Sequence, residues 1–341
     1  MVNGYPVPAL LKLYIIIFSD TISEFRDIPK GRMMYAGSLS ITNPSPRDWP
    51  KFQRFFRYAY HMKGEVWQGG SPFVKSSLGR PHYSLEKDLF VADLNRRIVG
   101  IADVTLELRI ARAIIEWFVH PAVQRKRVGR ELVKYACGRG NQLGARVAHV
   151  CIPEEDRFNR NFAVELGFFQ ARCFLGMEID LKGTVETFPF SENVEHFRAG
   201  DAALLATVQN RIFTGTWGFC PNSPEDIRYF FRLTQSKWQD ILMIRENEKI
   251  IGYSWLHPVI KKERAVEKRK WKLHMFGIDP EFQAKGRGKK LLQTSLGYVR
   301  KKDGTSLEIT IDSENTPAIN LYKSAGFKVK SREYWYAKDL L

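Results

Sequence analysis

The chain has 341 residues, of which 44% are hydrophobic and 26% charged, an ordinary globular composition and enough for two domains of about 150 residues each. Four cysteines without a CxxC pair, and no His/Cys cluster at metal-ligand spacing, exclude a disulfide framework and a metal site as expectations and favour a reducing cytoplasm. The formal net charge of +16 predicts an anionic partner, a positive field that aids solubility, or both.

Residues 1–34 are expected to form an N-terminal extension, because they have no counterpart elsewhere in the chain. Their apolar run from Leu10 to Phe18 contains Lys12 and is far shorter than the roughly 20 residues of a membrane-spanning helix. No small-residue cleavage site follows this run. We therefore expect no membrane anchor. The pair Met33-Met34 leaves two readings open, a loosely attached extension or an added upstream start.

The rest of the chain is an internal duplication. In the first half, Leu89–Ala92 and Ile98–Val104 predict a hairpin, and a series of landmark residues follows it. Pro121, Gln124, Gly129, Gly167-Phe168 and Asp180-Leu181 return as Pro280, Gln283, Gly288, Gly326-Phe327 and Asp339-Leu340, each 159 residues later. A constant offset of this kind indicates a repeat. The sequence thus predicts one domain over residues 35–183 and a second over residues 184–341.

The second half predicts the order helix, helix, hairpin, strand, helix, strand, helix, strand. The expected segments are Ala202–Ile212, Ile227–Leu233 after Ser223, Ile241–Arg245, Ile250–Trp255, Leu273–Ile278, Lys289–Arg300, Leu307–Ile311, Pro317–Ala325 after the N-cap Thr316, and Tyr334–Lys338. The hairpins are offset by 252 − 100 = 152, so the second copy gains seven residues, expected in a loop after Pro258. The predicted fold class is α/β, an α+β mixed sheet with helices on its faces, present twice.

Residues 283–290, QAKGRGKK, predict a phosphate-binding turn between a strand and a helix. Gly286 and Gly288 permit a tight turn and a close approach of a ligand to the main chain. The helix that follows offers unpaired N–H groups and the positive end of its dipole, so a diphosphate would suit the site. A basic turn without a ligand is the alternative, and the flanking strand and helices weigh against it.

The pattern Gln283-x-x-Gly286-x-Gly288, with Asn315-x-x-Ala318-x-x-Leu321-Tyr322-x-x-x-Gly326-Phe327 after it, resembles the acetyl-coenzyme A signature of the GNAT superfamily of N-acetyltransferases. The resemblance covers most of the second half, and the whole chain looks like two tandem GNAT domains. It implies acetyl-CoA as co-substrate and direct attack by a primary amine, without a covalent enzyme intermediate or a metal. The acceptor could be a small metabolite, an amino sugar, an antibiotic, or a protein terminus or lysine.

The resemblance also implies roles for residues of the second half. Main-chain amides would hold the diphosphate along Gln283, Ala284, Lys285, Gly286, Arg287, Gly288 and Lys289. The strand that ends in Phe276, Gly277 and Ile278 would pair with the pantetheine arm, and an amide near Phe276 or Gly277 would polarise the thioester carbonyl. Tyr322 would protonate the departing thiolate, and Asn315 would lie near the cofactor.

The sequence identifies the general base less clearly. His274 has a suitable pKa range and alternates in phase with Phe276 and Ile278, which predicts that the three side chains share a face of the strand. Glu308, on the next strand, is the other candidate, and a structural role stays open for both. The segment from Trp217 to Pro221 is expected to form one wall of the acceptor site or to be ordinary packing.

The first half departs from the signature at three positions. The offset of 159 maps Arg127 onto Gly286, Asp156 onto Asn315, and Ala163 onto Tyr322. Arginine hinders the glycine turn, aspartate adds negative charge near an anionic ligand, and alanine cannot donate a proton. We therefore expect this half to be catalytically silent, with residual coenzyme A binding through Gly129 as an open alternative.

Two other functions are compatible with the composition. A nucleic-acid-binding module would explain the charge, but the sequence has no recognisable reader motif, so this reading is not favoured. A non-catalytic sensor that binds acyl-CoA is favoured by the altered first half and opposed by Tyr322. The oligomeric state cannot be inferred.

Overall fold

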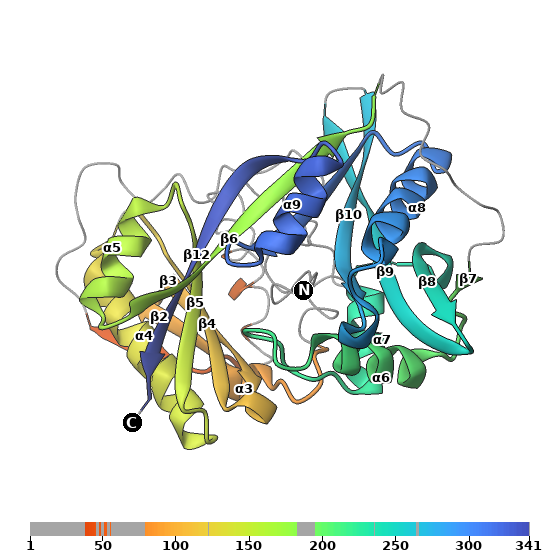
Figure 1. Ribbon diagram of the computed structural model, residues 1–341. Helices are drawn as coiled ribbons and strands as arrows, with labels where there is room; N and C mark the ends of the chain where they lie inside the picture. Colours follow the sequence, from red (N-terminus) through yellow and green to blue (C-terminus); the bar gives the residue numbers. More distant parts are fainter. Residues whose placement is uncertain are drawn as a thin grey trace. The chain divides into compact units, whose positions relative to one another are not determined.

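The computed structural model describes residues 38–45, 48, 51–52, 55, 79–121, 123–182, 195–234, 236–263 and 266–340. The expected extension at residues 1–34 lies outside this range. The described residues fall into two compact units. Of the described residues, the N-unit comprises those up to Ala171 together with Tyr334 to Leu340, and the C-unit comprises Arg172–Glu333 (Figure 1). Within the described ranges, no helix is both long and apolar enough to cross a membrane.

The strands of the N-unit have the order β1-β2-β3-β4-β5-β12 and are of mixed direction. Its elements are β1 (Leu39–Thr42), α3 (Leu85–Asp88), β2 (Leu89–Leu94), β3 (Arg97–Glu107), η3 (Leu108–Ile110), β4 (Arg112–Val119), α4 (Arg125–Gln142), β5 (Val147–Pro153), α5 (Arg157–Glu165) and the end of β12 (Lys328–Asp339). Strand β4 is antiparallel to β3 and parallel to β5. The hairpin predicted at residues 89–104 is therefore β2 and β3.

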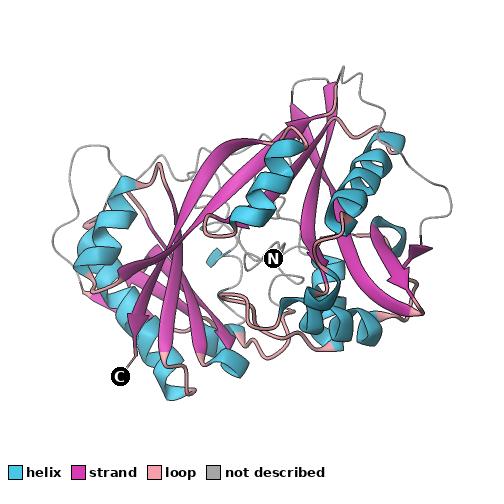
Figure 2. Ribbon diagram, viewed as in Figure 1, coloured by secondary structure: helices cyan, strands magenta, loops and turns pink. Residues whose placement is uncertain are grey.

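The strands of the C-unit have the order β6-β11-β10-β9-β8-β7 and are also of mixed direction. Its elements are β6 (Phe169–Asp180), β7 (Glu195–His196), α6 (Ala202–Phe213), α7 (Pro224–Leu233), η4 (Trp238–Asp240), β8 (Ile241–Glu246), β9 (Lys249–Glu263), β10 (Val266–Ile278), η5 (Pro280–Phe282), α8 (Arg287–Lys301), β11 (Ser306–Asp312) and α9 (Thr316–Ser324). This order confirms the predicted mixed α/β fold and its element sequence (Figure 2).

Helices cover both faces of the C-unit sheet, because each helix has one apolar stripe to bury. Leu291, Leu292 and Leu296 of α8 pack with Tyr322 of α9 against one face. Leu205 and other apolar residues of α6 pack against the opposite face. Helix α7 starts at Ser223 as predicted, since the Ser223 hydroxyl caps the Asp226 amide and the Asp226 carboxylate caps the Ser223 amide.

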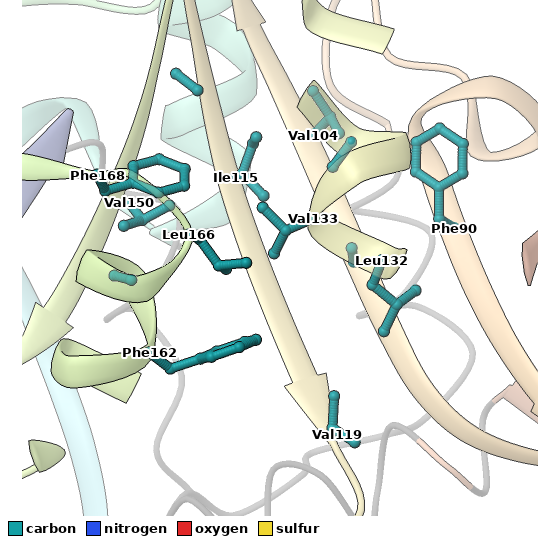
Figure 3. Packing of buried hydrophobic residues seen from close by; sticks show 14 of the residues in the cluster. Phe90, Val104, Ile115, Val119, Leu132, Val133, Val150, Phe162, Leu166 and Phe168 are labelled. Atoms are coloured by element: carbon teal, nitrogen blue, oxygen red, sulfur yellow. The ribbon is translucent and has the colours of Figure 1, made fainter. Parts of the chain in front are cut away.

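The N-unit core lies between its sheet and the helices α4 and α5. Val104, Ile115 and Val150 from the strands meet Leu132 of α4 and Phe162 of α5 (Figure 3). The side chains alternate along each strand, so one face supplies this cluster. Burial of such a cluster is the main favourable term for the unit, at about 25 cal/mol per Å² of apolar surface.

The last strand of each sequence repeat ends in the other unit. Met177, Ile179 and Leu181, from β6 and the residue after it, lie in the C-unit core. Tyr336 and Leu340, from β12 and the residue after it, lie in the N-unit core. The compact units therefore differ from residues 35–183 and 184–341 by an exchange of two strands.

The exchanged strands keep equivalent positions in the two units. The Leu181 amide donates to the Thr305 carbonyl over 2.9 Å, and the Leu340 amide donates to the Arg146 carbonyl over the same distance. These pairs are related by the repeat offset, since 340 − 181 and 305 − 146 both equal 159. Each strand thus makes in one unit the contact that its repeat makes in the other.

Two local expectations were wrong. The lysine-rich segment after Pro258 is not a loop, because β9 and β10 pair from Glu263 and Val266 inward and the extra residues lengthen both strands. The N-cap of α9 is not Thr316 but Asn315, whose side chain accepts the Ala318 amide. Asparagine and threonine are both good caps, so residue type alone did not decide between neighbours.

Candidate functional site

Strands β10 and β11 separate before they end. They pair in parallel from Lys270 with Ser306 to Leu273 with Ile309, and the pairing between these two described strands stops there. From Met275 to Ile278, β10 pairs with β9 alone. The main-chain groups on its other edge are therefore available to an extended ligand that adds to the strand.

A β-bulge lies at the point of separation. Leu273 pairs with Leu256 and Met275 with Trp255, so His274 is the extra residue on β10. The matching strands of the N-unit, β3 and β4, pair without a register shift. Equivalent positions of β10 and β4 differ in residue number by 270 − 112 = 158 before the bulge and by 275 − 116 = 159 after it. His274 therefore has no counterpart in the N-unit.

The bulge overturns the expectation that His274 shares a face with Phe276 and Ile278. Those two residues lie in the cluster under α8 and α9. The His274 ring instead contacts Trp255 and Phe230, with centroid distances of 5.0 and 6.0 Å, on the face covered by α6 and α7. An extra residue shifts the alternation of side chains by one, and the sequence pattern gives no sign of it.

The glycine turn has an unusual main chain. Ala284, Lys285 and Gly286 all have positive φ, with 69°, 31° and 73°. Gly286 is the N-cap of α8, and the three residues are exposed. A side chain at Gly286 would have open space around it, so the left-handed backbone, and not crowding, is what favours glycine. This turn presents main-chain groups to solvent immediately before a helix N-terminus, as an anion site requires.

The sequence-predicted residues of this turn have different tasks. Gln283 folds back, and its side-chain amide donates to the Ile278 carbonyl over 3.0 Å. The Arg287 guanidinium is bound by both oxygens of Glu246 on β8, with Nε to Oε2 at 2.8 Å and Nη2 to Oε1 at 2.7 Å. Lys285 and Lys289 are exposed. The arginine charge therefore anchors the turn, while the lysine charges remain available at its surface.

Tyr322 lies on α9 and is completely buried. Its ring contacts Phe276 of β10 and Phe327, with centroid distances of 6.0 and 5.5 Å. Its hydroxyl has no hydrogen-bond partner among the described residues. Burial raises the pKa of Tyr322 above its usual value, so the phenol stays protonated. A buried donor without an acceptor costs about 1–3 kcal/mol, and most buried polar groups in proteins have a partner.

The other residues predicted for the site make contacts within the C-unit. Gly277 lies on β10 where a Cβ would come within 2.5 Å of Ile212, so glycine here allows α6 to pack closely. Asn315 is buried and caps α9. Glu308 accepts a hydrogen bond from Lys270, 3.4 Å away, and is thus engaged in an ion pair. Trp217 contacts Phe174 of β6 with a centroid distance of 5.9 Å, so an exchanged strand supports the expected acceptor wall.

Sequence reasoning missed two residues of this region. Glu246 gave no signal, because a carboxylate before a hairpin turn is common on any surface. His257 lies two residues after Trp255 on β9, and strand alternation could have placed both on the face of His274. Its ring lies 6.1 Å from that of His274, centroid to centroid.

The N-unit lacks the glycine turn. Helix α4 begins at Arg125, which maps onto Ala284, so Arg125 to Arg127 are helical where the C-unit has three residues of positive φ. Phe162, next to Ala163, packs against Gly129 at the start of this helix, where an added Cβ would lie 2.8 Å from its ring. Asp156 caps α5 by accepting the Asn159 amide. The N-unit therefore has a helical turn and an aromatic ring close to the positions that correspond to the glycine turn of the C-unit.

A substitution at Gly286 tests the importance of the turn. We expect Gly286→Val to cost about 1–2 kcal/mol of stability, because a branched side chain disfavours positive φ. Coenzyme A should bind the variant more weakly in calorimetry. The control is Gly215→Val, which has a φ of 79° and open space but lies outside the turn. Equal coenzyme A affinity in both variants would contradict a role for the turn.

The sequence was also compared with known proteins. The acetyltransferase (GNAT) family model matches residues 52–168 and 205–327, which together are more than half of the chain. The chain therefore belongs to the GNAT family. It contains two copies of the GNAT domain, as the repeat predicted.

Curated relatives of this GNAT chain include mycothiol acetyltransferases. One from Propionibacterium freudenreichii is 25% identical over 52% of this chain and 57% of the relative, so the match spans little more than half of that protein. One from Salinispora arenicola is 26% identical over 76% of this chain and 84% of the relative. Among solved structures, the tandem GNAT protein from the clavulanic acid biosynthesis pathway superposes with a TM-score of 0.64, at 14% identity, over 89% of this chain and 99% of that chain. This structural likeness shows the shared fold.

Proposed function

We propose that the C-unit transfers an acetyl group from acetyl-CoA to a primary amine by direct attack. The observation that carries the proposal is the buried Tyr322 hydroxyl, which has no partner and whose ring contacts Phe276 on the strand with the open edge. A donor held in a closed apolar site needs an acceptor, and the sulfur of a leaving thiolate is one.

The residues present suit acetyl-CoA. The positive-φ turn from Ala284 to Gly286 and the N-terminus of α8 would bind the diphosphate through main-chain amides, with Lys285 and Lys289 adding charge. The open edge of β10 over Phe276, Gly277 and Ile278 would pair with the amides of the pantetheine arm. An amide of this edge would then polarise the thioester carbonyl and stabilise the oxyanion.

An acceptor ammonium first gives a proton to His274, a residue of intermediate burial, from which the proton passes to solvent. The amine then forms the C–N bond and the C–S bond breaks. Tyr322 protonates the thiolate and becomes a phenolate. After the attack, the nitrogen carries one proton more than the amide product, and this proton returns to Tyr322. Burial raises the pKa of Tyr322. The same desolvation would raise the pKa of a thiol bound beside it, so that proton transfer from the phenol to the thiolate stays feasible.

We assign this chemistry to the C-unit and propose that the N-unit is catalytically silent. Ala163 offers no proton, and the helical residues 125–127 leave no turn for a diphosphate. The acceptor remains a primary amine of undetermined class. The mycothiol acetyltransferase relatives make an amino-sugar derivative a reasonable member of the first panel to test.

Release of free thiol from acetyl-CoA, measured against a panel of small amines, amino sugars and peptides, tests the proposal. We expect turnover with at least one class of primary amine. Binding of coenzyme A without thiol release for any amine would instead support a non-catalytic sensor that binds acyl-CoA. Tight, salt-sensitive binding of RNA or DNA without coenzyme A binding would support the nucleic-acid module.

A further inference from the structure

Asp312 is a buried carboxylate at the end of β11, the strand beside the open edge of β10. Its side chain is 2% exposed. It lies three residues beyond Ile309, where the pairing of β11 with β10 stops. Ile311 packs with Tyr322 in the cluster under α8 and α9. Because side chains alternate along a strand, Asp312 faces the opposite side, away from Tyr322.

The loop between α6 and α7 crosses this side of the C-unit. At the end of α6, Ile212 packs against Gly277 of β10, where an added Cβ would lie 2.5 Å from it. Further along, Trp217 contacts Phe174 of β6 with a centroid distance of 5.9 Å. Phe174 is the cross-strand partner of Asp312, so the two side chains share a face. Since β11 lies between β10 and β6, the loop passes the end of β11 on the face of Asp312.

One oxygen of this carboxylate lacks a hydrogen-bond donor. Oδ1 accepts the Glu314 amide over 2.9 Å. Oδ2 has no donor in the part of the chain that the structure describes, and its ion-pair partner, Nε of Arg172, lies 3.8 Å away, beyond hydrogen-bond range. The Arg172 guanidinium pairs instead with the Glu314 carboxylate. Two carboxylates thus share one guanidinium, which leaves negative charge without compensation.

The electrostatics of Asp312 agree with an incomplete set of partners. Burial raises the pKa of Asp312, and the opposing effect of Arg172 is smaller. A net rise means that the ionised carboxylate is less well stabilised in the folded protein than in water. A cation or another hydrogen-bond donor at Oδ2 would remove this deficit.

The N-unit has no carboxylate at the equivalent position. The repeat offset, 312 − 153 = 159, places Pro153 there, at the end of β5. The side chain of proline can neither donate nor accept a hydrogen bond. A carboxylate is therefore present at this position in the unit that has the glycine turn and Tyr322, and absent from its repeat.

We propose that Asp312 determines the class of acceptor, in that its Oδ2 binds the ammonium of a primary amine that has no anionic group next to the nitrogen. This inference rests on the proposed function of the C-unit. A charge-assisted hydrogen bond from the ammonium would compensate the carboxylate and hold the nitrogen on the face opposite Tyr322. A carboxylate next to the nitrogen would be repelled by Asp312. Amino alcohols and amino sugars fit this site, and α-amino acids do not.

The first readout needs neither turnover nor coenzyme A. The probes are ethanolamine and L-serine, which is ethanolamine with a carboxylate on the carbon next to nitrogen. The carboxyl ¹³C resonance of Asp312, assigned by its loss in Asp312→Asn, reports the pKa of this group. We expect ethanolamine to lower the pKa of Asp312 by about 1, as a nearby cation does, and L-serine to leave it in place. No change with ethanolamine, or an equal change with both probes, would overturn the inference.

The second readout is the steady-state kinetics of a working amine. Asp312→Asn keeps an oxygen for the Glu314 amide and removes the charge. We expect KM for the amine to rise about 10- to 100-fold, the usual effect of losing a hydrogen bond to a charged group, with a smaller change in kcat. The preference for this amine over its analogue with a carboxylate next to the nitrogen should also shrink. A loss confined to kcat would contradict a role in selecting the acceptor.

Asp240→Asn is the matched control. Asp240 is a buried carboxylate of η4 in the same unit, and its Oδ1 accepts the Tyr298 hydroxyl over 2.8 Å. Its substitution should change stability and leave KM and the preference between amines in place. Equal changes in the Asp240 and Asp312 variants would reduce Asp312 to a structural residue. If the wild type releases no thiol with any amine, the proposed function fails, and the titration with ethanolamine still decides whether Asp312 binds an ammonium.

Discussion

Replacing Tyr322 with phenylalanine should lower kcat by about 10²- to 10⁴-fold, the usual contribution of a positioned general acid. The affinity for acetyl-CoA should change little, since the ring and its contacts with Phe276 and Phe327 remain. At the same time the free protein should become more stable, by about 1–3 kcal/mol, because the unpaired buried hydroxyl is removed. A lower kcat together with a higher stability would indicate that the Tyr322 hydroxyl serves the reaction and not the fold.

Tyr253→Phe is the matched control. Tyr253 is also completely buried, and its hydroxyl also lacks a partner among the described residues, but it lies on β9 in the cluster under α6. Its substitution should raise stability by a similar amount and leave kcat unchanged. Thiol release and denaturant unfolding measure the two effects. An active Tyr322→Phe variant, or one less stable than wild type, would remove Tyr322 from the mechanism.

Truncating the leucine that follows each exchanged strand should destabilise the unit formed mostly by the other half of the sequence. Leu340→Ala should cost about 2–5 kcal/mol in the N-unit, where Leu340 packs with residues of α4 and β5. Leu181→Ala, its equivalent in the repeat, should cost a similar amount in the C-unit. Hydrogen exchange resolved by peptide measures both.

The expected pattern of hydrogen exchange is specific to the strand exchange between the units. With Leu340→Ala, hydrogen exchange should become faster in residues 89–168, and the amides of residues 241–324 should stay protected. With Leu181→Ala the two patterns should swap. If each substitution instead affected its own half of the sequence, the strands would not be exchanged in solution. Because the two leucines make equivalent contacts, each variant serves as the control for the other.

The sequence alone determined the duplication, the mixed α/β fold and the position of the glycine turn. These features are local or periodic: the offset of 159 is counted directly, the hairpins and helices follow from alternation and caps, and the turn follows from Gly286 before a helical pattern. The departures of the first half from the signature, at Arg127 and Ala163, can also be read directly from the sequence. The structure adds that residues 125–127 are helical, which glycine at position 127 would have disfavoured.

Only the tertiary structure decided which side chains meet. A one-residue bulge moves His274 to the face of Trp255 and His257, and the strand pattern cannot reveal an inserted residue. Arg287 pairs with Glu246 instead of remaining free, since a guanidinium is bound by whichever carboxylate the fold brings near. The exchange of β6 and β12 is hidden for the same reason: the two strands are repeats with the same pattern, so either could fill either place, and the connections and packing of the folded chain make the choice.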